Sequence, residues 1–245
     1  MNIYHLSDLH WGAGYAQKVG FELAVNYLIQ INDVSGVIVV SGDVVEGVNK
    51  GEWVPARAHL MRLREVYLDR LLIVPGNHDC SDWKGITYCN NAASRTKFYL
   101  NTICPNFKPS SNGLRVTTNQ GVKFIGVDTC IGNSDDRIPP LARGEIGTSQ
   151  LAGLELELQD EVPTFIIMHH KPFSTNVTLL LEDRAEFLKL VRRRHHVKAV
   201  FFGHIHLSSV QDFGGVRYFE SDNTTISRRV RVVDSESLEH FHITF

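Results

Sequence analysis

The sequence predicts an α/β fold in which short buried strands alternate with helices. Val37 to Val40 are four consecutive β-branched residues, and such a run is typical of a strand that is buried on both faces. The run stops at Ser41-Gly42-Asp43, and four other apolar runs also end in residue types that bind metals. Strands separated by helices favour parallel pairing with right-handed crossovers. Because open α/β sheets bind ligands beyond the carboxyl ends of their strands, we expect a functional site there.

The part of the chain before residue 80 shows this alternation most clearly. Strands are predicted at 3–6, 37–41 and 71–74, and Pro75-Gly76 ends the last of them. Helical spacing of apolar residues predicts helices over 16–31 and 53–67. We expect the apolar stripe of the first helix to consist of Val19, Leu23, Tyr27 and Ile31, and that of the second to consist of Ala56, Leu60, Leu63 and Tyr67.

The rest of the chain is less regular but continues the pattern. A short helix is predicted at 92–102, and a hairpin of strands 114–118 and 122–128 turns at Asn119-Gln120-Gly121. Residues 129–147 form a long loop of the kind that often serves function. A helix at 149–158, with Thr148 or Ser149 as its N-cap, a strand at 164–168, a helix at 182–194 and a strand at 199–202 follow. The tail, 208–245, is predicted to be a meander of short strands with a tight turn at Gly214-Gly215.

Length, charge and cysteine content restrict the class of protein. The 245 residues are 43% apolar and show no linker-like change in composition, so we expect a single domain over 1–245. The net charge of −2 is spread along the chain, which disfavours a dedicated nucleic-acid binder. We expect neither a membrane span of about 20 apolar residues nor a signal peptide. Four cysteines without C-x-x-C spacing favour free thiols and a cytoplasmic location.

The strand ends supply a set of candidate metal ligands: Asp8, His10, Asp43, Asn77, His169, His204 and His206. This mixture of imidazole, carboxylate and amide suits Mn, Fe, Zn, Co or Ni and argues against a structural, cysteine-rich zinc site. Seven ligands are too many for one ion and fit two. Two ions about 3.5–4 Å apart can clamp the attacking and leaving oxygens of an in-line phosphoryl displacement, and one carboxylate must then bridge them.

The order of these segments resembles the calcineurin-like metallophosphoesterase superfamily. Its five ordered blocks are similar to Asp8-Leu9-His10, Gly42-Asp43, Gly76-Asn77-His78-Asp79, His169 and Gly203-His204-Ile205-His206, and the resemblance covers residues 1 to about 210. It implies a two-sheet β-sandwich flanked by helices in four α/β/β/α layers. It also implies that Asp8, His10 and His206 hold one metal, that Asn77, His169 and His204 hold the other, and that Asp43 bridges.

The resemblance also implies catalytic roles. His78 is the family's histidine that is not a ligand, and it would stabilise the transition state or protonate the leaving oxygen, a contribution typically of ~10²–10⁴-fold. Some members pair it with an acid three residues after the bridging aspartate. Here that residue is Glu46 in place of the commoner aspartate, and it would orient His78. Gly47 stands where the protein-phosphatase branch has arginine, while Asp79 follows the motif histidine as in many cyclic-nucleotide and other phosphodiesterases, so the chain resembles that branch.

Other polar residues near the motifs are weaker candidates. Arg143, His170 and Lys171 are candidate substrate contacts, because they lie in the long loop or directly after the strand that ends at His169. Cys80 directly follows the Gly76–Asp79 motif and is interpreted as a small filler residue. The basic run Arg192-Arg193-Arg194 ends a predicted helix, where cations favourably meet the negative end of the helix dipole, so it need not bind nucleic acid.

The favoured function is therefore a phosphoester hydrolase that depends on two divalent metal ions. Within this class the sequence favours a phosphodiesterase that uses a metal-bridging hydroxide on a small-molecule phosphoester. A DNA exonuclease of the repair type, a phosphomonoesterase and a catalytically silent metal-binding subunit are the alternatives. The chain resembles the repair nucleases in its opening Ser-Asp-x-His run, but the balanced charge lacks a groove that tracks phosphates. The substrate and the metal identity stay open, and the segments 81–111 and 129–147 are expected to determine the substrate.

Overall fold

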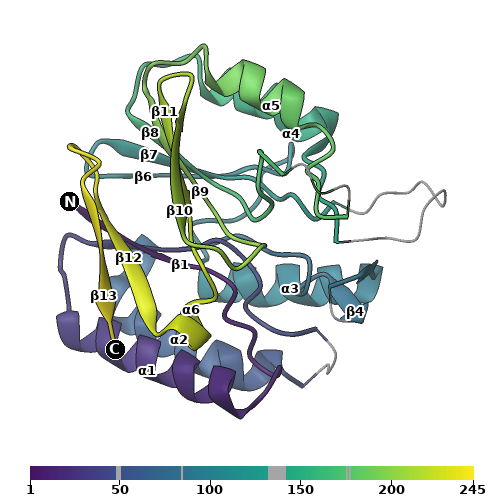
Figure 1. Cartoon of the computed structure of the whole chain (residues 1–245), viewed down its shortest axis with the longest axis vertical. Coiled ribbons are helices and arrows are strands. Elements are labelled where there is room, and N and C mark those ends of the chain that lie inside the picture. The colour runs from purple at the N-terminus through teal and green to yellow at the C-terminus, as the bar shows by residue number, and fades with distance from the viewer. Residues whose placement is uncertain (48–50, 84, 132–141, 175, 177) are drawn as a thin grey trace.

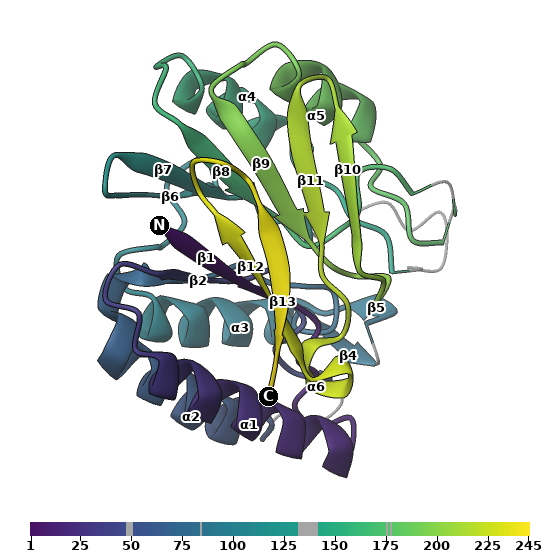
Figure 2. The ribbon, with the colours of Figure 1, turned by 60° about the vertical axis from the view of Figure 1, so that its left-hand side comes forward.

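Two β-sheets pack face to face, and helices cover both outer faces (Figure 1, Figure 2). This computed structural model describes residues 1–47, 51–83, 85–131, 142–174, 176 and 178–245. The helices α1, α2 and α3 lie on one side of the sandwich, and α4 and α5 lie on the other. The predicted α/β class and the four-layer arrangement are thereby confirmed.

The first sheet is built mainly from the N-terminal part of the chain. Its order is β13-β12-β1-β2-β3, with β1 at Asn2–Leu6, β2 at Val37–Val40 and β3 at Leu71–Ile73. These three strands are parallel, as their separation by helices α1 (Tyr15–Ile31) and α2 (Trp53–Tyr67) predicts. The antiparallel strands β12 (Arg229–Asp234) and β13 (His240–Thr244) complete this sheet from the C-terminal end of the chain.

The second sheet has the order β10-β11-β9-β8-β7-β6. Its bounds are Arg115–Asn119 for β6, Val122–Gly126 for β7, Thr164–Ile167 for β8, Val197–Phe202 for β9, Ser209–Phe213 for β10 and Val216–Glu220 for β11. The predicted hairpin is β6–β7, and β7, β8 and β9 are parallel. Helices α4 (Gly147–Glu157) and α5 (Arg184–Val191) pack on the outer face of this sheet.

Shorter elements connect the two sheets. The 3-10 helix η1 (Leu68–Arg70) precedes β3, and α3 (Asn90–Ile103) lies where a short helix is predicted. A small hairpin of β4 (Ser81–Trp83) and β5 (Thr87–Tyr88) and the single turn α6 (Thr224–Ser227) have no counterpart in the sequence interpretation.

The core between the sheets contains a row of aromatic side chains. Phe124, Phe165, Phe201 and Phe219 come from four neighbouring strands of the second sheet and stack with ring-centroid separations of 5.6, 5.8 and 5.4 Å. All four are fully buried in one cluster with the inward-facing residues of the first sheet. Since burial of each phenyl ring stabilises the fold by about 1.5–3 kcal/mol, this row holds the two sheets, and so the two halves of the site, in a fixed relation.

Two predictions about helices are wrong in detail. The buried face of α1 consists of Gly20, Phe21, Ala24, Val25 and Leu28, whereas the predicted stripe lies beside it, and Leu23 is 41% exposed. Gly20 lies on this face because a Cβ there would come within 2.1 Å of the Thr225 carbonyl oxygen in α6. Helix α4 starts without Thr148 or Ser149 as its cap. Instead, the Asp183 carboxylate accepts hydrogen bonds from the backbone N–H groups of Ile146 and Gly147.

The tail also departs from the predicted meander. Its first hairpin, β10–β11, turns at Gly214-Gly215 as predicted and joins the second sheet, but β12–β13 joins the first. The alternation of polar and apolar residues in a strand does not specify its partner, because each sheet offers a free edge. Helix α6 lies between the two hairpins and against α1, which places it near the site.

Candidate metal centre

The seven predicted ligands lie at one edge of the sandwich, beyond the carboxyl ends of five parallel strands. Asp8 and His10 follow β1, Asp43 follows β2, and Asn77 follows β3. His169 follows β8, while His204 and His206 follow β9 in the second sheet. Both sheets therefore contribute, and residues almost 200 positions apart meet, as in the hydrogen bond from the His204 N–H to Asp8 Oδ2 (3.1 Å).

The first group of donors comprises Asp8, His10 and His206. Asp8 Oδ1 lies 3.3 Å from His206 Nε2 and 3.8 Å from His10 Nε2, and the two imidazole nitrogens are 3.1 Å apart. Asp8 Oδ1 is buried without a hydrogen-bond partner. A buried carboxylate oxygen that accepts no hydrogen bond of good geometry and lies beside two imidazole nitrogens is stabilised by a cation placed among them. These three side chains therefore fit one divalent cation.

The second group comprises Asn77, His169 and His204. Asn77 Oδ1 lies 2.9 Å from His169 Nε2 and 3.0 Å from His204 Nδ1. The Nδ1 atom of His169 lies 2.8 Å from the Ser41 carbonyl oxygen, to which it must donate, so Nε2 faces the group. Such a backbone contact sets the tautomer and orientation of a metal-binding histidine. An amide oxygen and two imidazoles around one point fit a second cation.

Asp43 lies between the two groups. Its Oδ2 atom is 3.3 Å from His169 Nε2 and 3.8 Å from His10 Nε2, and its Oδ1 atom accepts the backbone N–H of His78 at 2.9 Å. Burial lowers the pKa of His169, but the charge of Asp43 outweighs this effect and raises the pKa to about 9. The buried carboxylates thus attract positive charge to the place where the resemblance puts a metal.

The backbone of the site is held in conformations that L-residues seldom adopt. Asp8, His10, Asp43, His204 and His206 all have positive φ, between 47° and 80°. Such residues are strained by about 1–3 kcal/mol each and cluster at functional sites. Glycines allow the close packing: a Cβ on Gly42 would lie 2.6 Å from His169 Nδ1, and one on Gly76 would lie 2.2 Å from Asp43 Oδ1. These contacts explain why the Gly42-Asp43 and Gly76-Asn77 motifs contain glycine.

The carboxylate of Glu46 contacts both His10 and His78. Its Oε2 atom lies 3.0 Å from His10 Nδ1 and 3.4 Å from His78 Nδ1. Burial raises the pKa of Glu46, but hydrogen bonds from His10 and His78 outweigh it and lower the pKa to about 2. Burial lowers the pKa of His78, but the charges of Asp43 and Glu46 outweigh it and raise the pKa to about 9. The contact with His78 agrees with its predicted orienting role, and the contact with His10 is a finding of the structure alone.

Asp79 supports the motif loops. Its buried carboxylate accepts the backbone N–H groups of Gly76 (2.9 Å) and Val45 (3.0 Å), and so ties the loop after β3 to the loop after β2. Burial and the nearby charge of Asp43 raise its pKa to about 7. The next residue, Cys80, is buried against Cys130 and lies at the edge of a separate cavity of about 670 Å³ between α3 and α4.

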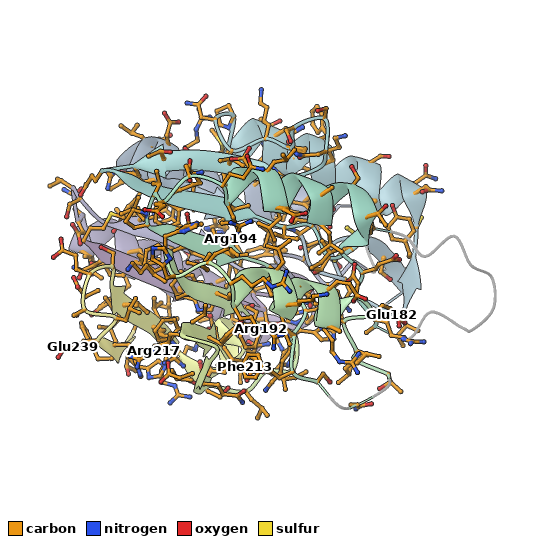
Figure 3. All side chains as sticks on the ribbon, turned by 90° about the horizontal axis from the view of Figure 1, so that it is seen from above. Glu182, Arg192, Arg194, Phe213, Arg217 and Glu239 are labelled. Atoms are coloured by element: carbon orange, nitrogen blue, oxygen red, sulfur yellow. The ribbon has the colours of Figure 1, made fainter. Side chains whose placement is uncertain are left out.

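The three candidate substrate contacts already have partners within the protein. Lys171 forms an ion pair with the fully buried Glu220 (2.8 Å), and Arg143 forms one with Glu182, which is labelled in Figure 3. His170 is fully buried behind His204 and contacts the Thr129 hydroxyl through Nδ1 at 2.8 Å. A role in substrate binding stays a prediction for all three. The cations at Arg192 and Arg194 follow the end of α5, as the helix-dipole interpretation requires (Figure 3).

A pocket of about 490 Å³ opens beside the first group of donors. Its floor contains His10, Glu46, His78 and His206. Its walls come from two elements that the sequence interpretation did not assign to the site: Ala13 and Gln17 at the start of α1, and Asp222, Asn223, Ile226 and Ser227 in and before α6. No motif marks these wall residues, because they meet the floor only through tertiary packing. Of the described helices, none is both long and apolar enough to cross a bilayer.

Comparison with known proteins agrees with this geometry. A family model for calcineurin-like phosphoesterases matches residues 1–208. A dual-specificity cAMP/cGMP phosphodiesterase from Mycobacterium tuberculosis is 31% identical over 232 residues, which are 87% of this chain and 64% of that protein. A probable cyclic nucleotide phosphodiesterase from Vesicomyosocius okutanii is 22% identical over 91% of this chain and 83% of its own length.

The fold also has close counterparts among solved structures. A dimetal phosphatase from Danio rerio superposes with a TM-score of 0.64 over 100% of this chain and 99% of that one, at 14% sequence identity. At this identity the likeness shows the fold alone. The chain spans just under two thirds of the mycobacterial relative, so the activity of that whole protein does not transfer directly.

Proposed function

This chain belongs to the calcineurin-like phosphoesterase family, and we propose that it is a phosphodiesterase that uses two divalent metal ions. The observation that carries the proposal is the convergence of the seven ligands in two groups with Asp43 between them. The names of the two relatives support diester over monoester hydrolysis. A small-molecule phosphoester is the proposed substrate, and a cysteine pattern without C-x-x-C spacing is in keeping with a reducing cytoplasm.

The roles of the side chains follow from their positions. Asp8, His10 and His206 would hold one cation, Asn77, His169 and His204 would hold the other, and Asp43 would contact both. When bound, the cation pair supplies Lewis acidity to the phosphate oxygens and activates a water nucleophile.

The protein's own contribution to bond cleavage centres on His78. Its ring lies on the floor of the pocket and is held between Glu46 and the Asp43 segment, with its backbone N–H bonded to Asp43 Oδ1. A histidine that carries a proton at neutral pH can donate it to the departing alkoxide oxygen. Glu46, whose Oε2 atom lies 3.4 Å from His78 Nδ1, favours that protonated form.

Two measurements test the proposal. The metal-loaded protein should hydrolyse bis-(p-nitrophenyl) phosphate faster than p-nitrophenyl phosphate when Mn²⁺ is added. Absence of turnover with every divalent metal tried, in protein shown to be folded by circular dichroism, would refute an esterase function. A preference for the monoester would replace the diesterase by a phosphomonoesterase, and degradation of DNA in a gel assay would favour the exonuclease alternative.

The ligand roles are tested separately from turnover. Asp43→Asn should remove most of the bound metal, because it weakens both groups of donors. His78→Ala should retain the metal and lose activity by about 10²–10⁴-fold, the usual contribution of a general acid. Elemental analysis of the two purified variants decides the assignment, and loss of the metal in His78→Ala would mean that His78 is itself a ligand.

A further inference from the structure

A cavity of about 670 Å³ between α3 and α4 is separate from the metal centre, and its volume lies in the usual range for a small organic ligand. One wall is a face of α3, with lining residues three or four positions apart: Asn90, Ala93, Lys97 and Leu100. Another wall is the start of α4, and the beginning of β6 and the segment after β7 complete the lining. None of the seven proposed metal ligands is among the described residues that line it, so a ligand bound here need not touch the metal centre.

Arg115 is a buried cation on the lining of this cavity. It lies at the start of β6, is 3% exposed and forms no ion pair with any described residue. Its Nη1 atom donates to the Phe107 carbonyl oxygen at 2.8 Å, whereas Nε is buried without a hydrogen-bond partner. A guanidinium that is removed from water is unfavourable unless an anion compensates its charge. No described side chain supplies that anion in direct contact.

Asp128 is a carboxylate on the same lining, in the segment that follows β7. The Gln150 side chain fixes its backbone, because Oε1 accepts the Asp128 N–H at 2.9 Å and Nε2 donates to the Asp128 carbonyl oxygen at 2.6 Å. The Oδ1 atom of Asp128 accepts the Cys130 N–H at 2.8 Å, while Oδ2 accepts no hydrogen bond from a described residue. Since Asp128 also forms no ion pair with a described residue, Oδ2 is available to a cation in the cavity.

The charges of Arg115 and Asp128 attract each other although the two side chains do not meet. Burial lowers the pKa of Arg115, and the charge of Asp128 opposes this effect. Burial raises the pKa of Asp128, whereas the Cys130 N–H and the charge of Arg115 lower it. Both side chains line one cavity without forming an ion pair with each other. They therefore offer separate charge-assisted hydrogen bonds to a ligand that carries charges of both signs.

We propose that this cavity binds a small zwitterion of the amino-acid type, with its carboxylate at Arg115 and its ammonium group at Asp128. A simple anion would pair with Arg115 but would face the Asp128 carboxylate, and a simple amine would meet the opposite mismatch. The inference goes beyond the proposed hydrolysis and does not rest on it, because the zwitterion binds outside the metal centre and is neither substrate nor product there.

The binding test is isothermal titration calorimetry on the full chain loaded with Mn²⁺. The probes are the standard amino acids, β-alanine and γ-aminobutyrate, which vary the separation of the two charges and the size of the ligand. At least one probe should bind with a dissociation constant below about 1 mM. The carboxylate that lacks its ammonium group and the amine that lacks its carboxylate should each bind about tenfold more weakly, as expected when a hydrogen bond to a charged group is lost.

Charge variants assign the two ends of the ligand. Asp128→Asn keeps an oxygen for the Cys130 N–H and removes the negative charge. It should weaken binding of the zwitterion about 10–100-fold without weakening binding of the carboxylate analogue. Arg115→Met should weaken binding of both over the same range. If circular dichroism shows that Arg115→Met does not fold, Asp128→Asn still decides between the two ligand classes.

Bulky variants on α3 locate the ligand. Ala93→Trp places a large ring in the cavity and should abolish binding. Asn91→Trp is the matched control, because Asn91 is exposed on the same helix and is not among the lining residues. It should keep the wild-type affinity. Removal of Mn²⁺ with EDTA should also leave the affinity unchanged, since the ligand does not contact the metal.

Several results would overturn the proposal. They are the absence of binding by every probe, equal affinity for a zwitterion and its carboxylate analogue, and unchanged binding in Ala93→Trp. Loss of binding in folded, EDTA-treated protein would place the ligand at the metal centre and would overturn it as well. These measurements do not depend on turnover of a phosphoester, so failure of the proposed function and failure of this inference are distinguishable.

Discussion

The ion pair between Lys171 and Glu220 allows a direct choice between a structural and a substrate-binding role for Lys171. Glu220 on β11 is fully buried, and its Oε2 atom is contacted by Lys171 Nζ at 2.8 Å and by the Ser209 hydroxyl, while Oε1 has no partner. The Lys171 side chain itself is only 12% exposed. The Lys171→Met variant would keep the aliphatic part of the side chain and leave the Glu220 carboxylate with a single neutral donor.

The expected loss of stability follows from this burial. Removing one partner of a buried ion pair typically destabilises a protein by 3–5 kcal/mol, and the residual exposure of Lys171 favours the lower end, about 3 kcal/mol. For a chain of this size each kcal/mol lowers the melting temperature by about 2–4 °C, so we expect a decrease of about 6–12 °C. The double variant Lys171→Met/Glu220→Gln should recover part of this loss, because no unpaired charge is then buried.

Urea unfolding followed by circular dichroism measures the free energy of unfolding of each variant. Steady-state kinetics on bis-(p-nitrophenyl) phosphate measures kcat/KM and so reports on the catalytic site. We expect kcat/KM of Lys171→Met to stay within about twofold of the wild type below its unfolding temperature. Lys108→Met, which removes an exposed lysine outside any helix, is the control and should change neither quantity. Unchanged stability together with a raised KM would refute the structural role and restore Lys171 as a substrate contact.

Two further predictions concern other carboxylates. Glu46→Gln should lower activity by about 10–100-fold, the usual effect of losing the partner of a ligand histidine, because His10 and His78 both lose a charged contact. Glu46→Asp tests whether the longer side chain is needed to reach both rings, and activity equal to the wild type in both variants would contradict this role. Asp33 lies away from the metal ligands. Burial raises the pKa of its carboxyl group, but hydrogen bonds from Asn2, Ser35 and Tyr4 outweigh this effect. Together they lower the pKa from the ordinary 3.8 to about 2. Its folded-state pKa is therefore depressed, so its contribution to stability is present above pH 3.8 and is lost as the pH falls toward 2. The urea midpoints of the wild type and Asp33→Asn should differ at pH 6 and converge near pH 2; a constant difference would show that the charge of Asp33 is not responsible.

Much of the fold could be predicted because the signals are local. Helix α2 buries Ala56, Leu60, Leu63 and Tyr67, which is the predicted stripe, together with Trp53 at its start. Helix α1 differs because its close approach to α6 requires Gly20 on the inner face. Hydrophobic spacing detects large side chains that need burial, and it does not detect small ones that are needed because another element lies near.

The sequence by itself determined the candidate metal ligands that we propose, because the strand ends, the glycine positions and the types of donor side chain can all be recognised within a few residues of one another. It also predicted the edge at which they meet, since parallel strands present their carboxyl ends together. Only the tertiary structure decided that Glu46 reaches His10 as well as His78, and that β12–β13 crosses to the first sheet while β10–β11 stays in the second. The tertiary structure also decided the composition of the pocket, because its walls come from the start of α1 and from the segment around α6. Contacts between segments some 200 residues apart depend on how the sheets pack, and no spacing within either segment encodes that distance.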